Sequence, residues 1–245
     1  MSSRYKVIVV ISLLLVAVVL SGCGDPRPIK QLPAPTPIGR MVEPTPTLAP
    51  ALAGAMGAQQ SPQAAEIPAV APASPPDATA GQEIFAQNCV ACHGQDGKGV
   101  VQGTPDFTSP EYARNAIPAV LFEVITNGKG AMPAWGGVLD EQQRWDVLFY
   151  ELDFGVTNEM VARGKEVFAQ NCAACHGQDG TGVVEGTPDF TDPAFWASRS
   201  MAQEFEIVTN GKGAMPAWGA VLSEDDRWAA VSYIRTFGYT STHQP

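Results

Sequence analysis

The sequence predicts an all-α protein in which two tandem copies of one small module follow a disordered, proline-rich tether. Residues 81–154 align with residues 164–237 without an insertion, and 45 of the 74 aligned positions are identical. Each copy shows helical apolar spacing, whereas no segment alternates convincingly between apolar and polar residues as a strand would. Of the 21 prolines, 13 lie between residues 24 and 79.

The first 22 residues have the pattern of an export signal. Arg4 and Lys6 precede fourteen mostly apolar residues, 7–20. A helix of that length spans about 21 Å, which is shorter than a hydrocarbon core about 30 Å thick. Residues 1–22 are therefore predicted to be a signal peptide rather than a transmembrane helix.

The signal ends in a Leu-Ser-Gly-Cys sequence that closes at Cys23. It resembles a bacterial lipobox, which implies cleavage before Cys23 and a lipid on its sulfur. Acyl chains would hold the protein on the membrane, since each buried methylene contributes about 0.8 kcal/mol. The alternatives are ordinary cleavage with an unmodified thiol and an uncleaved anchor.

Residues 23–78 are predicted to form the lipid-anchored linker. The segment is rich in proline and alanine, has few large apolar residues and shows no helical or strand periodicity. Such a composition buries too little apolar surface to offset the entropy of ordering. Three interpretations remain open: a leash that lets the modules move, a spacer that clears the lipid surface, and a segment that becomes ordered on a partner.

Each module contains helix boundary signals. In the first copy, Thr79 and Gln82 have the spacing of a capping box. Short helices are expected at residues 118–126 and 201–209. The last helix of each copy is expected at residues 141–154 and 224–237, with Asp140 and Ser223 as N-caps and Gly155 and Gly238 as C-caps.

A Cys-x-x-Cys-His run occurs once in each copy, at residues 89–93 and 172–176. This is the attachment pattern of a c-type haem, because two thiols three positions apart can each bond to one vinyl group of the porphyrin. The adjacent histidine can then ligate the iron. The residues assigned to covalent attachment of two haems are Cys89, Cys92, Cys172 and Cys175.

The second axial ligand follows from counting donors. His93 and His176 supply one ligand each, and the third histidine, His243, lies outside the repeats, so bis-histidine ligation of both haems is impossible. Of the seven methionines, only Met132 and Met215 occupy equivalent positions, both in Gly-x-Met-Pro-x-Trp. We therefore expect His/Met ligation of each iron, although methionine also serves as a core filler.

These residues resemble those of class I c-type cytochromes, especially the two-domain members. Gly81, Phe85 and Cys89 show the family spacing, and Gly164 and Phe168 repeat it before the second attachment run. The resemblance covers nearly all of residues 79–238. It implies that the glycine lets the first and last helices cross closely and that the aromatic residue packs at the crossing, against Tyr150 and Phe154 in the first copy and Tyr233 and Phe237 in the second.

The resemblance also assigns the neighbours of the ligands. The carbonyl groups of Pro105 and Pro188 are expected to accept the other ring N–H of the ligand histidines, although a turn proline is the alternative. Trp135 and Trp218 are expected to wall the haems, through an indole bond to a propionate or through apolar packing alone. The predicted domains are residues 79–156 and 157–240, followed by a tail at 241–245.

The net charge of the chain and the expected iron ligands exclude some classes of function. The net charge of −10 argues against nucleic-acid binding. Residues 80–245 carry 10 basic and 21 acidic side chains, which predicts redox partners with a basic docking surface. An iron with both axial positions filled has no site for a substrate, so we expect an exported electron carrier or a haem subunit of a respiratory or photosynthetic membrane complex, such as alternative complex III or a terminal oxidase. The alternative is a dihaem enzyme such as a peroxidase.

Overall fold

The structure is a computed structural model that describes residues 68–243. The predicted signal peptide, the predicted lipidation site at Cys23 and most of the predicted linker lie outside these residues. Among the described residues, no helix is both long and apolar enough to cross a membrane. Both modules fall in one compact unit.

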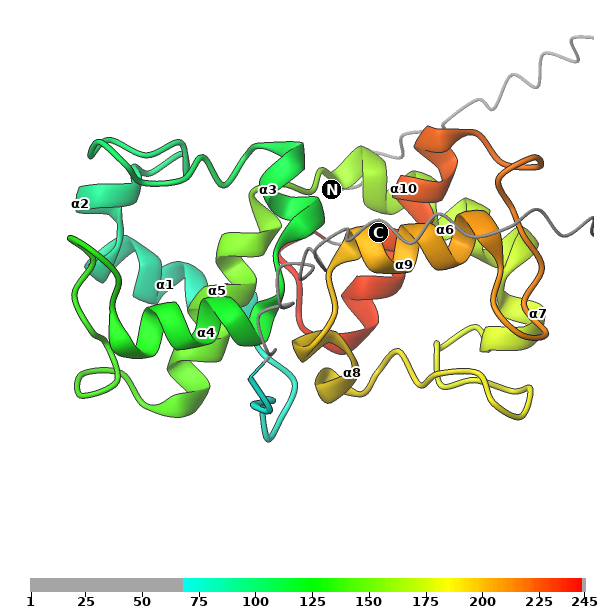
Figure 1. Cartoon of the computed structure of the whole chain (residues 1–245), viewed down its shortest axis with the longest axis horizontal. Helices are drawn as coiled ribbons and strands as arrows, with labels where there is room; N and C mark the ends of the chain where they lie inside the picture. The colour runs from blue at the N-terminus through cyan, green and yellow to red at the C-terminus, as the bar shows by residue number, and fades with distance from the viewer. Residues whose placement is uncertain (1–67, 244–245) are drawn as a thin grey trace, which may run out of the picture. The chain divides into compact units, whose positions relative to one another are not determined.

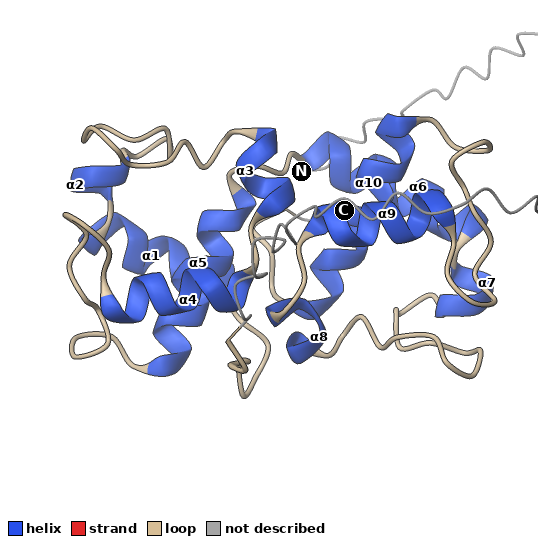
Figure 2. Cartoon of the chain, in the orientation of Figure 1, coloured by secondary structure: helices blue, strands red, loops and turns tan. Residues whose placement is uncertain are grey.

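The described residues are helical with long loops and contain no strand, only three isolated β-bridges, which agrees with the predicted all-α class (Figure 2). The first module contains α1 (Ala78–Asn88), α2 (Val90–His93), α3 (Pro110–Asn115), α4 (Pro118–Asn127) and α5 (Glu141–Asp153). The second contains α6 (Asn158–Asn171), α7 (Ala173–His176), α8 (Pro193–Ala197), α9 (Met201–Asn210), α10 (Glu224–Arg235) and the 3₁₀ turn η1 (Thr236–Gly238) (Figure 1).

The first and last helices of each module cross where a glycine removes the side chain. A Cβ atom on Gly81 would lie 2.1 Å from the carbonyl oxygen of Asp146, and one on Gly164 would lie 2.0 Å from that of Ala229. Both separations are far below van der Waals contact, so only glycine fits. The close crossing implied by the family resemblance is therefore confirmed in both modules.

Aromatic rings fill the crossing as expected. The Phe85 ring lies 5.4 Å from the centroids of both Tyr150 and Phe154. In the second module the corresponding distances from Phe168 to Tyr233 and to Phe237 are both 5.5 Å.

The helix boundaries differ from expectation in a few places. Asp77, rather than Thr79, is the N-cap of α1: its carboxylate accepts hydrogen bonds from the backbone N–H groups of Thr79 and Ala80. The predicted capping box is therefore wrong, because an aspartate two residues earlier takes its place. The N-caps at Asp140 and Ser223 are confirmed. The predicted C-caps Gly155 and Gly238 are wrong: α5 and α10 end earlier, at Asp153 and Arg235, so that Phe154 and Thr236 are the C-caps.

The end of the second module packs against the first. The carboxylate of Asp153 on α5 accepts hydrogen bonds from Tyr239, Ser241 and Thr242. Thr240 forms a β-bridge with Asp77, next to the start of α1. Residues 239–243 thus bind the two modules together instead of extending as a free tail.

Candidate haem-binding sites

Each Cys-x-x-Cys-His run starts at the residue that ends the first helix of its module. Cys89 closes α1 and opens α2, and Cys172 does the same between α6 and α7. The single helical turn that follows leaves these first cysteines half-buried, whereas Cys92 and Cys175 are exposed. The two thiols of each run therefore differ in environment, with one facing the interior of its module.

The interior thiols are held in their neutral form in the polypeptide. Burial, followed by the charges of Glu151 and Cys92, raises the pKa of Cys89 to about 12. Burial and the neighbouring Cys175 raise the pKa of Cys172 to about 11. Both values reflect an apolar surrounding, which suits a porphyrin edge better than a free thiolate.

The two candidate ligand histidines share one arrangement. The His93 ring stacks on Phe107 with centroids 4.8 Å apart and planes inclined by 15°, and His176 stacks on Phe190 at 5.0 Å and 19°. Burial lowers the pKa of both imidazoles, which favours the neutral form that ligates iron.

The predicted hydrogen bonds to the proline carbonyls are not formed in this structure. The Nδ1 atoms of His93 and His176 are buried and have no hydrogen-bond partner. The rings instead pack against Phe107 and Phe190, two residues beyond Pro105 and Pro188. Stacking on these phenylalanines orients the imidazoles here.

The methionine loop is a tight turn in both modules. Lys129 and Met132 exchange two backbone hydrogen bonds of 3.1 and 3.0 Å, and Lys212 and Met215 repeat this. Gly128 precedes the turn with φ 75°, and a Cβ atom there would lie 2.6 Å from the Met132 carbonyl oxygen. Glycine is therefore required for the backbone to present the methionine at this position.

In the first module, the predicted residues come together around one cavity. A small cavity of about 20 Å³ is lined by Cys89, His93, Met132, Trp135 and, from α5, Glu151, together with apolar side chains. Trp135 is fixed there because its backbone N–H donates to the carbonyl of Ile125 on α4. Attachment thiol, imidazole and thioether thus face the same space.

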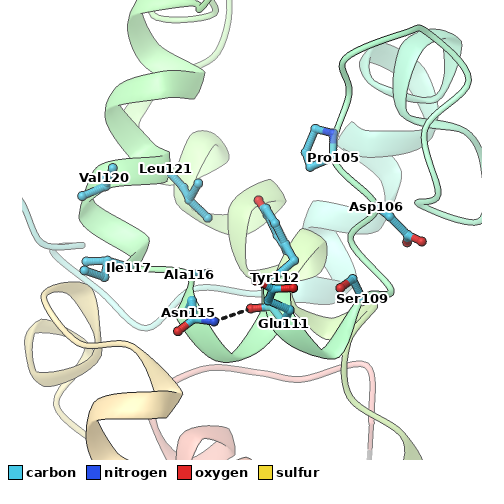
Figure 3. Close-up of a pocket in the computed structure, with 10 residues that line it drawn as sticks. All are labelled: Pro105, Asp106, Ser109, Glu111, Tyr112, Asn115, Ala116, Ile117, Val120 and Leu121. Atoms are coloured by element: carbon cyan, nitrogen blue, oxygen red, sulfur yellow. Dashed lines mark hydrogen bonds between the residues drawn. The ribbon is translucent and has the colours of Figure 1, made fainter.

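A larger hollow of about 660 Å³ lies in the same module, along the segment that runs from Pro105 through α3 to Leu121 on α4 (Figure 3). Tyr112 lines it, and the Tyr112 hydroxyl donates a hydrogen bond to the carboxylate of Glu151. This hydrogen bond links the hollow to the residues of the small cavity.

These residues fit a covalently attached c-type haem. The donor set is a neutral imidazole and a thioether, with thiols at the attachment spacing and aromatic walls. The buried, unpartnered Nδ1 atom of His93 is the polar atom that an outer ligand partner would satisfy.

The second module places its equivalents in two packed groups. Cys172 and Phe190 belong to one apolar cluster, and Met215 and Trp218 pack with Met201, Val208 and Trp228 in another. Cys89 and Met132 of the first module pack against one cluster, whereas Cys172 and Met215 of the second pack against different ones.

Sequence reasoning missed two features of the sites. The first is the stacking of Phe107 and Phe190 on the histidines. Both phenylalanines follow their histidine at the same spacing, so the repeat could have identified them as residues of the site. The Tyr112–Glu151 hydrogen bond was harder to predict, because the repeat does not show it twice. The second module has Phe195 and Ile234 at the equivalent positions, and Tyr112 and Glu151 meet only when the chain folds.

A family model described as cytochrome c oxidase, cbb3-type, subunit III matches residues 76–150 and 159–234, which correspond to the two modules. The cbb3-type cytochrome c oxidase subunit FixP of Azorhizobium caulinodans is 33% identical over 173 residues, covering 64% of this chain and 59% of its own length. Subunit CcoP of Cereibacter sphaeroides is 33% identical over 176 residues, covering 65% and 60%. The chain thus spans less than two thirds of the length of these relatives.

Among solved structures, cytochrome c6 of the diatom Phaeodactylum tricornutum is 32% identical over a region that covers 32% of this chain and 94% of that protein, with a TM-score of 0.28.

Proposed function

Because this chain belongs to the family of cytochrome c oxidase, cbb3-type, subunit III, we propose that it passes single electrons within a membrane-bound terminal oxidase. It is an electron-transfer protein with two covalently attached c-type haems, one in each cytochrome c domain. The relatives named above are oxidase subunits, which favours this type of complex over alternative complex III.

The observation that carries the proposal is the shared cavity of His93, Met132 and Cys89. We assign His93 with Met132, and His176 with Met215, as axial ligands of the two irons. Covalent attachment is assigned to Cys89, Cys92, Cys172 and Cys175. Iron held by these residues in each module would have no open position for a substrate, and a haem bound there would supply one-electron transfer through its edge.

The proposal also assigns roles to the residues beside the haems, to the acidic surface and to the membrane anchor. Trp135 and Trp218 wall the haems, and the carbonyls of Pro105 and Pro188 accept from the ligand histidines once each haem is in place. The acidic surface docks against basic redox partners. A lipid on Cys23 anchors the exported chain to the outer face of the cytoplasmic membrane, and the linker spans the distance to the partner.

Purification of the native protein in mild detergent tests complex membership. We expect co-elution with large, haem-containing oxidase subunits that mass spectrometry identifies. Elution of the dihaem chain alone, under conditions that keep other membrane complexes intact, would contradict the proposal.

Carbon monoxide distinguishes the carrier from a dihaem peroxidase. A carrier with two six-coordinate haems gives no rapid reaction with CO in the reduced state. A peroxidase needs one open or displaceable position, so rapid CO binding at one haem of the purified chain would favour the enzyme.

A further inference from the structure

The two haem sites differ in one buried pair of side chains. Glu151 lines the small cavity of the first module beside Cys89, and its side chain is almost fully buried, with the residue 9% exposed. The Tyr112 hydroxyl donates a hydrogen bond to its carboxylate. At the equivalent positions the second module has Ile234 and Phe195, neither of which can carry a charge.

One cationic side chain of the second module, Arg235, lies near this pair. Arg235 reaches toward the first module from α10, is 2% exposed, and interacts electrostatically with Asp153, Tyr239 and Tyr112. The carboxylate that interacts with Arg235 is that of Asp153. Glu151 lines the cavity and forms no salt bridge within the part of the chain that the structure describes.

The two arginines of the first module, Arg114 and Arg144, lie over aromatic rings. The Arg114 guanidinium lies over the Trp228 ring at 4.1 Å, and that of Arg144 lies over Phe122 at 5.1 Å. Burial raises the pKa of Glu151 to about 7, partly offset by the bond from Tyr112. At mildly alkaline pH the first site therefore contains a buried negative charge.

We propose that the Tyr112–Glu151 pair holds the reduction potential of the first module's haem below that of the second module's haem. A nearby negative charge favours ferric over ferrous iron, because the ferric centre carries one more positive charge and a buried interaction is weakly screened. A single electron shared by the two modules therefore resides mainly in the second. This inference rests on the ligand assignments of the proposed function.

Spectroelectrochemical titration of the full-length dihaem protein at mildly alkaline pH tests it. Two one-electron steps are expected, and the Met132→His variant identifies the first module's step because a second imidazole lowers only that potential. Glu151→Gln should raise the lower step, by about tenfold in the one-electron equilibrium constant or about 59 mV. The upper step should stay in place.

Two further variants exchange the residues of this pair between the modules, and a third is a control. Glu151→Ile introduces the residue of the second module and should also raise the lower step, while the double variant Phe195→Tyr with Ile234→Glu should lower the upper one. Glu141→Gln removes an exposed carboxylate from the start of the same helix and should move neither step. Haem content per chain, measured for every variant, separates haem loss from a change in potential.

The proposal is overturned if Met132→His moves the upper step, or if both Glu151 variants leave the lower step in place. The measurement needs no partner protein. Failure to co-purify with an oxidase would therefore count against the proposed complex and leave this inference standing.

Discussion

The hydroxyl of Tyr239, beyond the last helix of the second module, donates a hydrogen bond to the carboxylate of Asp153 at the end of the first module's last helix. Asp153 is 2% exposed and also accepts from Ser241 and Thr242. A buried carboxylate is stable only when it is well paired. The contact therefore makes the stability of each module depend on the other.

Removing this donor should destabilise the whole protein. Tyr239→Phe is expected to lower the free energy of unfolding by about 1.5–3 kcal/mol, because the lost bond is to a charged group. Urea denaturation of the haem-loaded protein measures it. Ser74→Ala removes a hydroxyl that makes an exposed hydrogen bond to Gln142 and serves as the control; equal midpoints for both variants would show that the interface contributes little.

A methyl group added at the crossing of α1 and α5 should destabilise the protein. Gly81→Ala is expected to reduce the free energy of unfolding by about 1–3 kcal/mol or more, since the new Cβ would meet the Asp146 carbonyl and push α1 from α5. Gly137→Ala is the matched control, because nothing lies within 4 Å of a Cβ there. Urea midpoints and haem content check both, and identical behaviour of the two variants would refute the argument.

Replacing one methionine ligand should leave an open coordination position on one of the two irons. In the reduced state, Met132→Ala should bind CO at half of the haem and Met215→Ala at the other half, as read from CO difference spectra. Met160→Leu alters a methionine outside the repeated positions and should bind none. If Met132→Ala also binds none, another residue ligates the first iron.

Stability should depend on pH through Glu151. Its folded pKa of about 7 exceeds the ordinary value of 4.5, so the folded protein holds this proton more tightly than the unfolded chain. The contribution is fully present below pH 4.5 and is lost as pH rises through about 7. A shift of this size corresponds to about 3 kcal/mol.

Urea unfolding of the haem-loaded protein across that pH range measures the effect. The wild type should lose stability relative to Glu151→Gln as the pH rises, because glutamine does not titrate. Other titrating groups contribute equally to both proteins and cancel in the difference. Parallel stability curves would rule out a buried titrating Glu151.

Much of the fold could be predicted because its signals are local. The caps Asp140 and Ser223 act on backbone groups three residues away. The short helices α3 and α8 were missed because they are only 6 and 5 residues long and each opens with a proline. Helices this short depend on the packing of their surroundings.

The sequence by itself determined the repeat, the attachment cysteines, the candidate axial ligands and the glycines at the helix crossings. These depend on residue chemistry and on spacing within one module, which a gapless repeat displays twice. The tertiary structure alone decided that Tyr112 meets Glu151, that Asp153 meets Tyr239, and that Phe107 stacks on His93. Such pairs form only when distant segments are buried together, since burial forces an ionisable or polar group to find whichever partner the packing brings within reach.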